Sequence, residues 1–233
     1  MLYICYGMLK SASTFAFQIA IDIAQTHSDR GSLMQKLPQD LRASFIPENL
    51  GLTLQKINEF IPKEEIYVIK THCKLDEETE ELLSKGLAKA MISYRDPYDI
   101  VVSLKDAGDI ERRKDPTQQR PYFTKIKDYQ DALKRLPYIM ADAEPWLKEE
   151  KIHRIQFSEI ASDPIKVAQE MANYMGVTVD QSKITQIIES YTSNKKSIIE
   201  FNVGIKGRGH KEFSLPETDP IKQEMDRFLK LYF

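Results

Sequence analysis

The sequence has little of several features that would define a specialised class of protein. It contains only two cysteines, Cys5 and Cys73, in 233 residues, which excludes a disulfide-rich secreted scaffold. Both fall in or at the end of an expected strand, so we interpret them as small buried apolar residues rather than a disulfide pair. The four histidines show no paired ligand spacing, and no metal site is therefore expected.

Long apolar runs are missing as well. No stretch approaches the length of a membrane-spanning helix, and the first residues lack the basic region and the cleavage-like site of a signal peptide. We therefore expect a cytoplasmic protein without a membrane span. The formal net charge is −2 at pH 7, which argues against a general nucleic-acid binder, so any basic site must be local.

The chain does show a regular alternation of short apolar runs and helical periodicity. Strands are expected at residues 2–6, 66–69, 90–94 and 153–157, and helices at 14–24, 77–85, 97–106, 124–140 and 164–175. This alternation predicts an α/β protein with a central parallel sheet and helices on both faces. We expect a single domain over residues 1–233. The irregular stretch Ala107–Tyr122 is a mobile lid or a plain surface loop, and its polar composition favours the plain loop.

The first expected strand runs into a short polar turn and then a helix, in the segment YGMLKSASTF. Phosphates bind where backbone N–H groups converge at a helix N-terminus, and Lys10 adds a cation there. The turn also supplies hydroxyl groups, from Ser11, Ser13 and Thr14. It is not a standard Walker A loop, because Lys10 follows Gly7 too early and Ala12 stands where a second glycine would be expected. We interpret it as a cradle for a phosphate or sulfate ester; a strand–helix connection with a solvated lysine is the alternative.

Polar side chains also follow the later strands. Lys70 and His72 follow the second expected strand, Arg95 follows the third, and Ser158 follows the fourth. Ligands of doubly wound sheets bind beyond the carboxyl ends of the strands. A site is therefore expected at this edge, although each residue taken alone also fits an ordinary strand end.

Four segments resemble, in order, blocks of the cytosolic-type sulfotransferases, which use 3′-phosphoadenosine 5′-phosphosulfate (PAPS). They are YGMLKSASTF, VIKTHCKL, YRDPYDIVVSLKD and FSEIASDP, beside family blocks that read roughly PKSGTTW, VKTHLP, RNPxDxxVS and YEDMKEDP. A fifth, weaker match is NVGIKGRGHKEFS at Asn202–Ser214, beside RKGxxGDWKNxFT. The resemblance implies a three-layer P-loop-like fold and a sulfotransferase that moves the sulfuryl group from PAPS to a hydroxyl acceptor without a metal.

The resemblance also implies roles for single residues. Lys10 would steady the charge on the bridging oxygen of the sulfate ester, His72 would act as general base, and Lys70 would lie near the transferred group. Lysine as the cation and histidine as the base also suit in-line transfer on chemical grounds. The donor would be bound by Ser11, Ala12, Ser13, Thr14 and Phe15 at the phosphosulfate, by Arg95 and Ser103 at the 3′-phosphate, and by Phe157 near the adenine. Core packing is the alternative for Phe157.

The chain departs from the family pattern at two places. Ala12 replaces a glycine, and it fits if its φ is negative. Asn202 and Val203 replace an Arg-Lys pair. We hypothesise that the basic loop 204–211 closes over the 3′-phosphate in their place; a plain solvated loop is the alternative. The loop residues expected to bind are Gly204, Lys206, Gly207 and Arg208.

The sequence leaves the acceptor open. We expect a small molecule with a hydroxyl group, because a histidine base suits an O–H nucleophile, and an amine is the alternative. Two other functions compete: a P-loop kinase that uses ATP and magnesium, and a non-catalytic nucleotide-binding protein. The oligomeric state is also open, because the C-terminal segment Pro220–Phe233 can pack within the chain or at a subunit interface.

Overall fold

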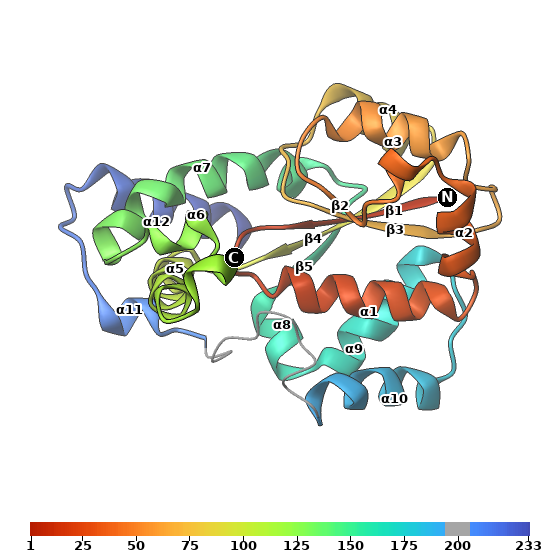
Figure 1. The fold of residues 1–233 in the computed structure, drawn as a ribbon. Coiled ribbons are helices and arrows are strands. Elements are labelled where there is room, and N and C mark those ends of the chain that lie inside the picture. Colours follow the sequence, from red (N-terminus) through yellow and green to blue (C-terminus); the bar gives the residue numbers. More distant parts are fainter. Residues whose placement is uncertain (194–205) are drawn as a thin grey trace.

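The centre of the molecule is a five-stranded sheet (Figure 1). The structure is a computed structural model, and it describes residues 1–193 and 206–233. The strand order is β2-β3-β1-β4-β5, and every pair is parallel. The strands are β1 (Leu2–Gly7), β2 (Phe45–Ile46), β3 (Tyr67–Thr71), β4 (Ala88–Tyr94) and β5 (His153–Gln156). The expected α/β fold with a central parallel sheet is confirmed.

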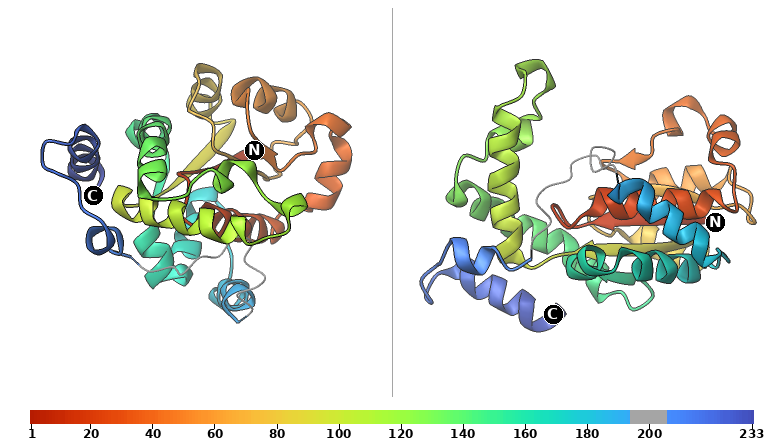
Figure 2. Two further views of the ribbon diagram at one scale, coloured as in Figure 1. Left: turned by 60° about the vertical axis from the view of Figure 1, so that its left-hand side comes forward. Right: turned by 90° about the horizontal axis from the view of Figure 1, so that it is seen from below.

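Helices cover both faces of the sheet. They are α1 (Ser13–Gln25), α2 (Arg30–Lys36), α3 (Leu50–Asn58), α4 (Glu77–Ser84), α5 (Pro97–Arg112), α6 (Pro121–Thr124), α7 (Tyr129–Lys148), α8 (Phe157–Ser162), α9 (Pro164–Met175), α10 (Gln181–Thr192), α11 (Gly209–Glu212) and α12 (Pro220–Tyr232). Helices α1, α9 and α10 lie on one face, and α3, α4 and α7 lie on the other (Figure 1). Helices α5, α11 and α12 lie beyond the carboxyl ends of the strands (Figure 2).

The side-chain alternation of β1 explains the three layers. Leu2, Ile4 and Tyr6 belong to the apolar core beneath α3 and α7, whereas Tyr3 and Cys5 belong to the core beneath α1 and α9. All five are at most 2% exposed, as expected for the central strand of a parallel sheet that is buried on both faces. Cys5 is buried as expected, and both cysteines are free.

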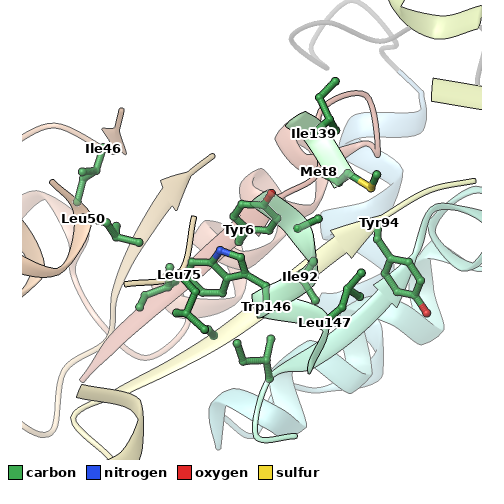
Figure 3. Close-up of a cluster of buried hydrophobic side chains, with 14 of the residues drawn as sticks. Tyr6, Met8, Ile46, Leu50, Leu75, Ile92, Tyr94, Ile139, Trp146 and Leu147 are labelled. Atoms are coloured by element: carbon green, nitrogen blue, oxygen red, sulfur yellow. The ribbon is translucent and has the colours of Figure 1, made fainter. Parts of the chain in front are cut away.

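Trp146 anchors the core next to the end of β1 (Figure 3). Its ring stacks on that of Tyr6 with centroids 4.9 Å apart, and its Nε1 donates a hydrogen bond of 3.0 Å to the carbonyl oxygen of Cys73. The side chain is fully buried, so this indole joins α7 to β1 and to the residues that follow β3. Helix α7 continues past Trp146 to Lys148 and contains two internal prolines.

Local signals set several boundaries. Helix α9 has the expected bounds Pro164–Met175, since Asp163 caps its first turn and Gly176 ends it with a φ of 85°. Three expectations are wrong. Helix α5 runs on to Arg112, so Ala107–Tyr122 is not a plain loop throughout; α7 begins only at Tyr129; and Phe157 opens α8 rather than ending a strand. Strand β2 is too short for its pattern to be visible in the sequence.

Within residues 1–193 and 206–233, no helix is long and apolar enough to cross a membrane. The same residues contain no group of three His, Cys, Asp or Glu side chains that could hold a metal ion. The cytoplasmic location stays a prediction. Helix α12 packs within the chain, and its Met225 and Phe228 are fully buried.

Candidate active site

The turn between β1 and α1 has an unusual backbone. Lys10 and Ala12 adopt left-handed conformations, with φ of 69° and 64°, and each costs about 1 kcal/mol relative to a right-handed residue. The condition under which alanine would fit here without strain, a negative φ, is therefore not met. Gly7 is required where the turn starts, because a Cβ there would lie 1.9 Å from the Cβ of Ser13. The strand and the helix thus approach each other as closely as their backbones allow.

Ser11 holds this turn against the sheet. Its Oγ donates to the carbonyl oxygens of Met8 at 2.6 Å and Ser93 at 2.9 Å, and it lies 2.9 Å from the Oγ of Ser93. Both serines are fully buried. The hydroxyl expected to face a ligand therefore pins the turn to β4 instead. The sequence analysis did not single out Ser93.

The N-terminus of α1 receives no side-chain cap from its own N-cap residue. Its N-cap is Ala12, which offers no side-chain acceptor, and no acidic residue occupies the first turn. All the other helices of at least eight residues in the described ranges have Asp or Asn at this position. The first N–H groups of α1 and the positive end of its dipole are therefore suited to an external anion.

The end of β3 brings Lys70 and His72 to the turn. The Lys70 Nζ donates to the Oγ1 of Thr14 at 2.6 Å, and the His72 Nδ1 lies 2.6 Å from the carbonyl oxygen of Gly7. A carbonyl only accepts, so Nδ1 carries the proton, and in the neutral ring Nε2 carries the lone pair. The ring of Phe45 packs edge-on against His72, with centroids 5.5 Å apart.

The Lys10 ammonium faces a ring contributed by α6. Its Nζ lies 5.5 Å from the ring centroid of Phe123, and the guanidinium of Arg120 lies 4.7 Å from the same centroid. Arg120 is held in turn by two hydrogen bonds from its guanidinium to the buried Glu111, at 2.8 and 3.0 Å. The residues after α5 are thus ordered around a buried carboxylate. Phe123 lies one residue beyond the stretch that the sequence analysis considered as a lid.

Arg95 lies at the end of β4, only 6% exposed. Its Nη1 donates to the carbonyl oxygen of Lys10 at 3.2 Å, and its Nη2 lies 3.6 Å from a carboxylate oxygen of Asp99. The guanidinium stacks 3.8 Å above the ring centroid of Phe157. Burial is the largest effect on the Arg95 pKa and lowers it, whereas the negative charge of Asp99 raises this pKa. Ser103 is buried further along α5.

The described part of the fifth block, from Lys206 to Ser214, lies next to α5. Gly207 has a φ of 74°, and Lys206 is exposed. The guanidinium of Arg208 donates to Asp106 at 2.7 Å and to Glu212 at 2.6 and 3.2 Å, so the structure directs it to two carboxylates. Gly204 lies outside the described residues.

Phe15 has an aromatic neighbour that the sequence analysis missed. In the first turn of α1, its ring packs edge-on against Tyr191 of α10, with centroids 5.7 Å apart. The Tyr191 hydroxyl donates to Asp22 at 2.6 Å, which fixes the phenol ring against α1. No periodic signal marks Tyr191, because only the tertiary fold places it beside Phe15.

A comparison with known protein families shows to which family the chain belongs. Residues 49–204 match the model of the sulfotransferase domain. The chain belongs to this family. The matched range includes Lys70, His72, Arg95 and Phe157. It begins after the Lys10 turn, whose assignment therefore rests on its geometry and on the quoted sequence block.

Solved sulfotransferase-like structures share the fold. A retinol dehydratase in complex with retinol and PAP has a TM-score of 0.58 at 14% identity, with 99% of this chain and 80% of that chain covered. The mouse sulfotransferase SULT7A1 complexed with PAP has a TM-score of 0.54 at 14% identity, with 99% and 83% covered. No curated protein sequence matches the chain.

The positive φ of Ala12 leads to a stability prediction for this sulfotransferase. Ala12→Gly should raise the free energy of unfolding by roughly 0.5–1 kcal/mol, because glycine adopts a left-handed conformation without strain. Ala141→Gly, on an exposed position of α7, is the matched control and should lower it by about 1 kcal/mol. Urea unfolding measures both. An Ala12→Gly loss as large as that of the control would show that residue 12 is not left-handed.

Glu111 leads to a prediction about pH. The hydrogen bonds that Arg120 donates to the Glu111 carboxylate are the main reason why the pKa of Glu111 is lowered from 4.5 to about 2. A lowered folded-state pKa adds stability that is complete above the unfolded value and is lost as the pH falls towards 2. Glu111→Gln should therefore cost about 2 kcal/mol at pH 7, and the deficit should shrink by pH 3.

Urea unfolding at both pH values measures this deficit. The exposed Glu150 provides the control variant Glu150→Gln, which should behave like the wild type at both. A Glu111→Gln deficit that stays constant between pH 7 and pH 3 would contradict the ion-pair explanation.

Proposed function

We propose that this sulfotransferase uses PAPS as donor and a small molecule with a hydroxyl group as acceptor, and that residues 1–233 form a single domain. The observation that carries the donor assignment is the turn before α1. There, a helix N-terminus without a side-chain cap lies beside two lysines and a buried arginine. The PAP bound in the structural neighbours supports the same donor.

The residues present fit an anionic nucleotide. The phosphosulfate end would be held by the first N–H groups of α1, with the hydroxyls of Ser13 and Thr14. The 3′-phosphate would be held by Arg95, assisted by Ser103 and by the exposed Lys206. Aromatic rings suit a nucleobase because it stacks on them, and Phe15, Tyr191 and Phe157 supply such rings near the two ends of the site.

Two of the expected donor contacts take a different form. Arg208 is already bound by Asp106 and Glu212, so we propose that it holds its loop in place and does not bind the phosphate directly. Ser11 likewise acts through the turn that its hydroxyl fixes. Ala12 contributes only its backbone, and so does Gly207. A contact from Gly204 stays a prediction.

The chain's own groups provide the chemistry of transfer. Bound PAPS supplies a sulfuryl group attached to a phosphate leaving group. The Lys10 ammonium neutralises negative charge that develops on the leaving oxygen. The bond from His72 Nδ1 to the Gly7 carbonyl fixes the imidazole and leaves Nε2 to accept the acceptor's proton. Lys70 orients the Thr14 hydroxyl and adds positive charge near the same place.

The acceptor proposal rests on this base and on the neighbours. Retinol and androsterone, which the retinol dehydratase complexes contain, are small molecules with a hydroxyl group. An amine acceptor is the alternative. The family assignment favours sulfuryl transfer over the magnesium-dependent kinase reaction, and the binding experiment below also separates these two.

The donor assignment predicts which nucleotide binds. Adenosine 3′,5′-bisphosphate should bind at least about tenfold more tightly than ADP with magnesium, because a charge-assisted Arg95–phosphate contact forms only with the 3′-phosphate. Calorimetric titration of the purified protein measures both. Tighter binding of ADP with magnesium would contradict the proposal and favour the kinase. Binding of neither would contradict a donor site of any kind.

The base assignment predicts a variant that binds but does not react. His72→Ala should bind adenosine 3′,5′-bisphosphate as the wild type does, and it should lose about 10²-fold or more in turnover. Turnover is measured with PAPS and the best acceptor from a panel of phenols, alcohols and amines. His27→Ala, at the exposed end of α1, is the control. Near wild-type turnover of His72→Ala would remove His72 from the mechanism.

A further inference from the structure

Asp99 is a buried carboxylate in the first turn of α5. Its side chain is only 2% exposed, and a carboxylate at such a depth is unfavourable unless hydrogen-bond donors surround it. The helix already has its cap, because Asp96 accepts the backbone N–H of Tyr98. Asp99 is therefore not needed to cap α5, and its donors come from elsewhere in the chain.

Two of these donors are backbone amides of the fifth block. The N–H of Gly207 donates to one carboxylate oxygen at 2.8 Å, and the N–H of Gly209 donates to the other at 2.9 Å. The backbone of Gly209 also touches α5, since a Cβ at this position would lie 2.1 Å from the carbonyl carbon of Tyr98. One carboxylate thus fixes both the place and the orientation of this loop.

The third partner of Asp99 is Arg95, which forms an ion pair with it. Its Nη2 lies 3.6 Å from the same Asp99 oxygen that accepts from Gly207. The Nη1 of Arg95 donates to the carbonyl oxygen of Lys10. A single chain of contacts therefore runs from the loop, through Asp99 and Arg95, to the turn before α1.

Two other contacts also hold this block on α5. The attachment of the loop to the helix can therefore be distinguished from the orientation of its backbone amides by Asp99. Arg208 binds Asp106, and the Nε2 of His210 lies 2.8 Å from Asp96. These two contacts remain if the charge of Asp99 is removed. An asparagine at residue 99 would present one oxygen and one NH₂ group, so one of the two amides would face a donor, and the ion pair with Arg95 would be lost.

We infer that Asp99 is a positioning residue for the binding of the 3′-phosphate. Asp99 orients the Arg95 side chain, and it aligns the backbone amides of residues 207 and 209 next to Arg95. The inference rests on the proposed function, because it assumes that Arg95 binds that phosphate. Asp99 itself does not touch the ligand. It affects the binding of the 3′-phosphate only, and the 5′ end of the nucleotide is bound by the turn before α1.

The test compares two nucleotides that differ in the 3′-phosphate alone. Wild type and Asp99→Asn are titrated calorimetrically with adenosine 3′,5′-bisphosphate and with adenosine 5′-monophosphate. The variant should lose about tenfold or more for the bisphosphate and less than about threefold for the monophosphate. Asp109→Asn, on the surface of the same helix, where it pairs with Lys105 and Arg112, is the control and should match the wild type with both.

The outcomes separate this inference from the proposed function. If the wild type does not prefer the bisphosphate, the donor proposal fails and the inference fails with it. If the wild type prefers the bisphosphate and Asp99→Asn keeps the same preference, only the inference is overturned. Equal losses for both nucleotides would also overturn it, since they would indicate a general structural role.

A second variant covers the case in which Asp99→Asn does not fold. Gly209→Ala places a methyl group against the Tyr98 backbone and so displaces the loop while Asp99 and Arg95 keep their side chains. It should show the same selective loss for the bisphosphate. An unchanged preference in a folded Gly209→Ala protein would overturn the inference.

Discussion

The hydroxyl of Ser11 lies between the end of β1 and the end of β4, and its contacts with Met8 and Ser93 fix the turn on which the site depends. This turn contains two left-handed residues that are not glycine, so it would relax if the anchor were absent. With the anchor in place, the carbonyl of Lys10 meets Arg95, and the N-cap position of α1 falls on Ala12, which has no side-chain acceptor. The neighbouring carbonyl of Gly7 sets the tautomer of His72. A buried side chain with no contact to a ligand thereby determines where the groups of the site lie.

Acidic residues carry out the corresponding task on the other side of the site. Asp96, Asp99 and Asp106 all lie at or within α5, and together they bind each residue of the segment Gly207–His210. Glu111, near the end of the same helix, binds Arg120 and orders the approach to Lys10. The positive charge of the site is thus offset by carboxylates whose hydrogen bonds and ion pairs are formed within the fold. This balance agrees with a net charge of only −2.

Much of the architecture could be predicted from the sequence, because it follows from local patterns. The four long strands alternate with amphipathic helices, and Asp163 and Gly176 define α9 at both ends. The polar residues at the strand ends lie close together at one edge of the sheet, as their positions in the sequence predict. What could not be predicted depends on contacts between distant segments. The conformation of Ala12, the tether from Ser11 to Ser93, and the pairing of Phe15 with Tyr191 are set by the fold as a whole. Strand β2 was missed because two residues show no periodicity.

The central place of β1 also has a consequence for how the chain folds as it is made. This strand pairs with β3 and β4 only, so its partners follow it by more than sixty residues. During synthesis, the apolar side chains of β1 cannot be fully buried in the sheet until β4 has left the ribosome. Such long-range strand pairing is slow and prone to aggregation. The strand that leads into the turn before α1 is therefore completed late, because the turn takes its final place only after Ser93 of β4 is available to hold Ser11.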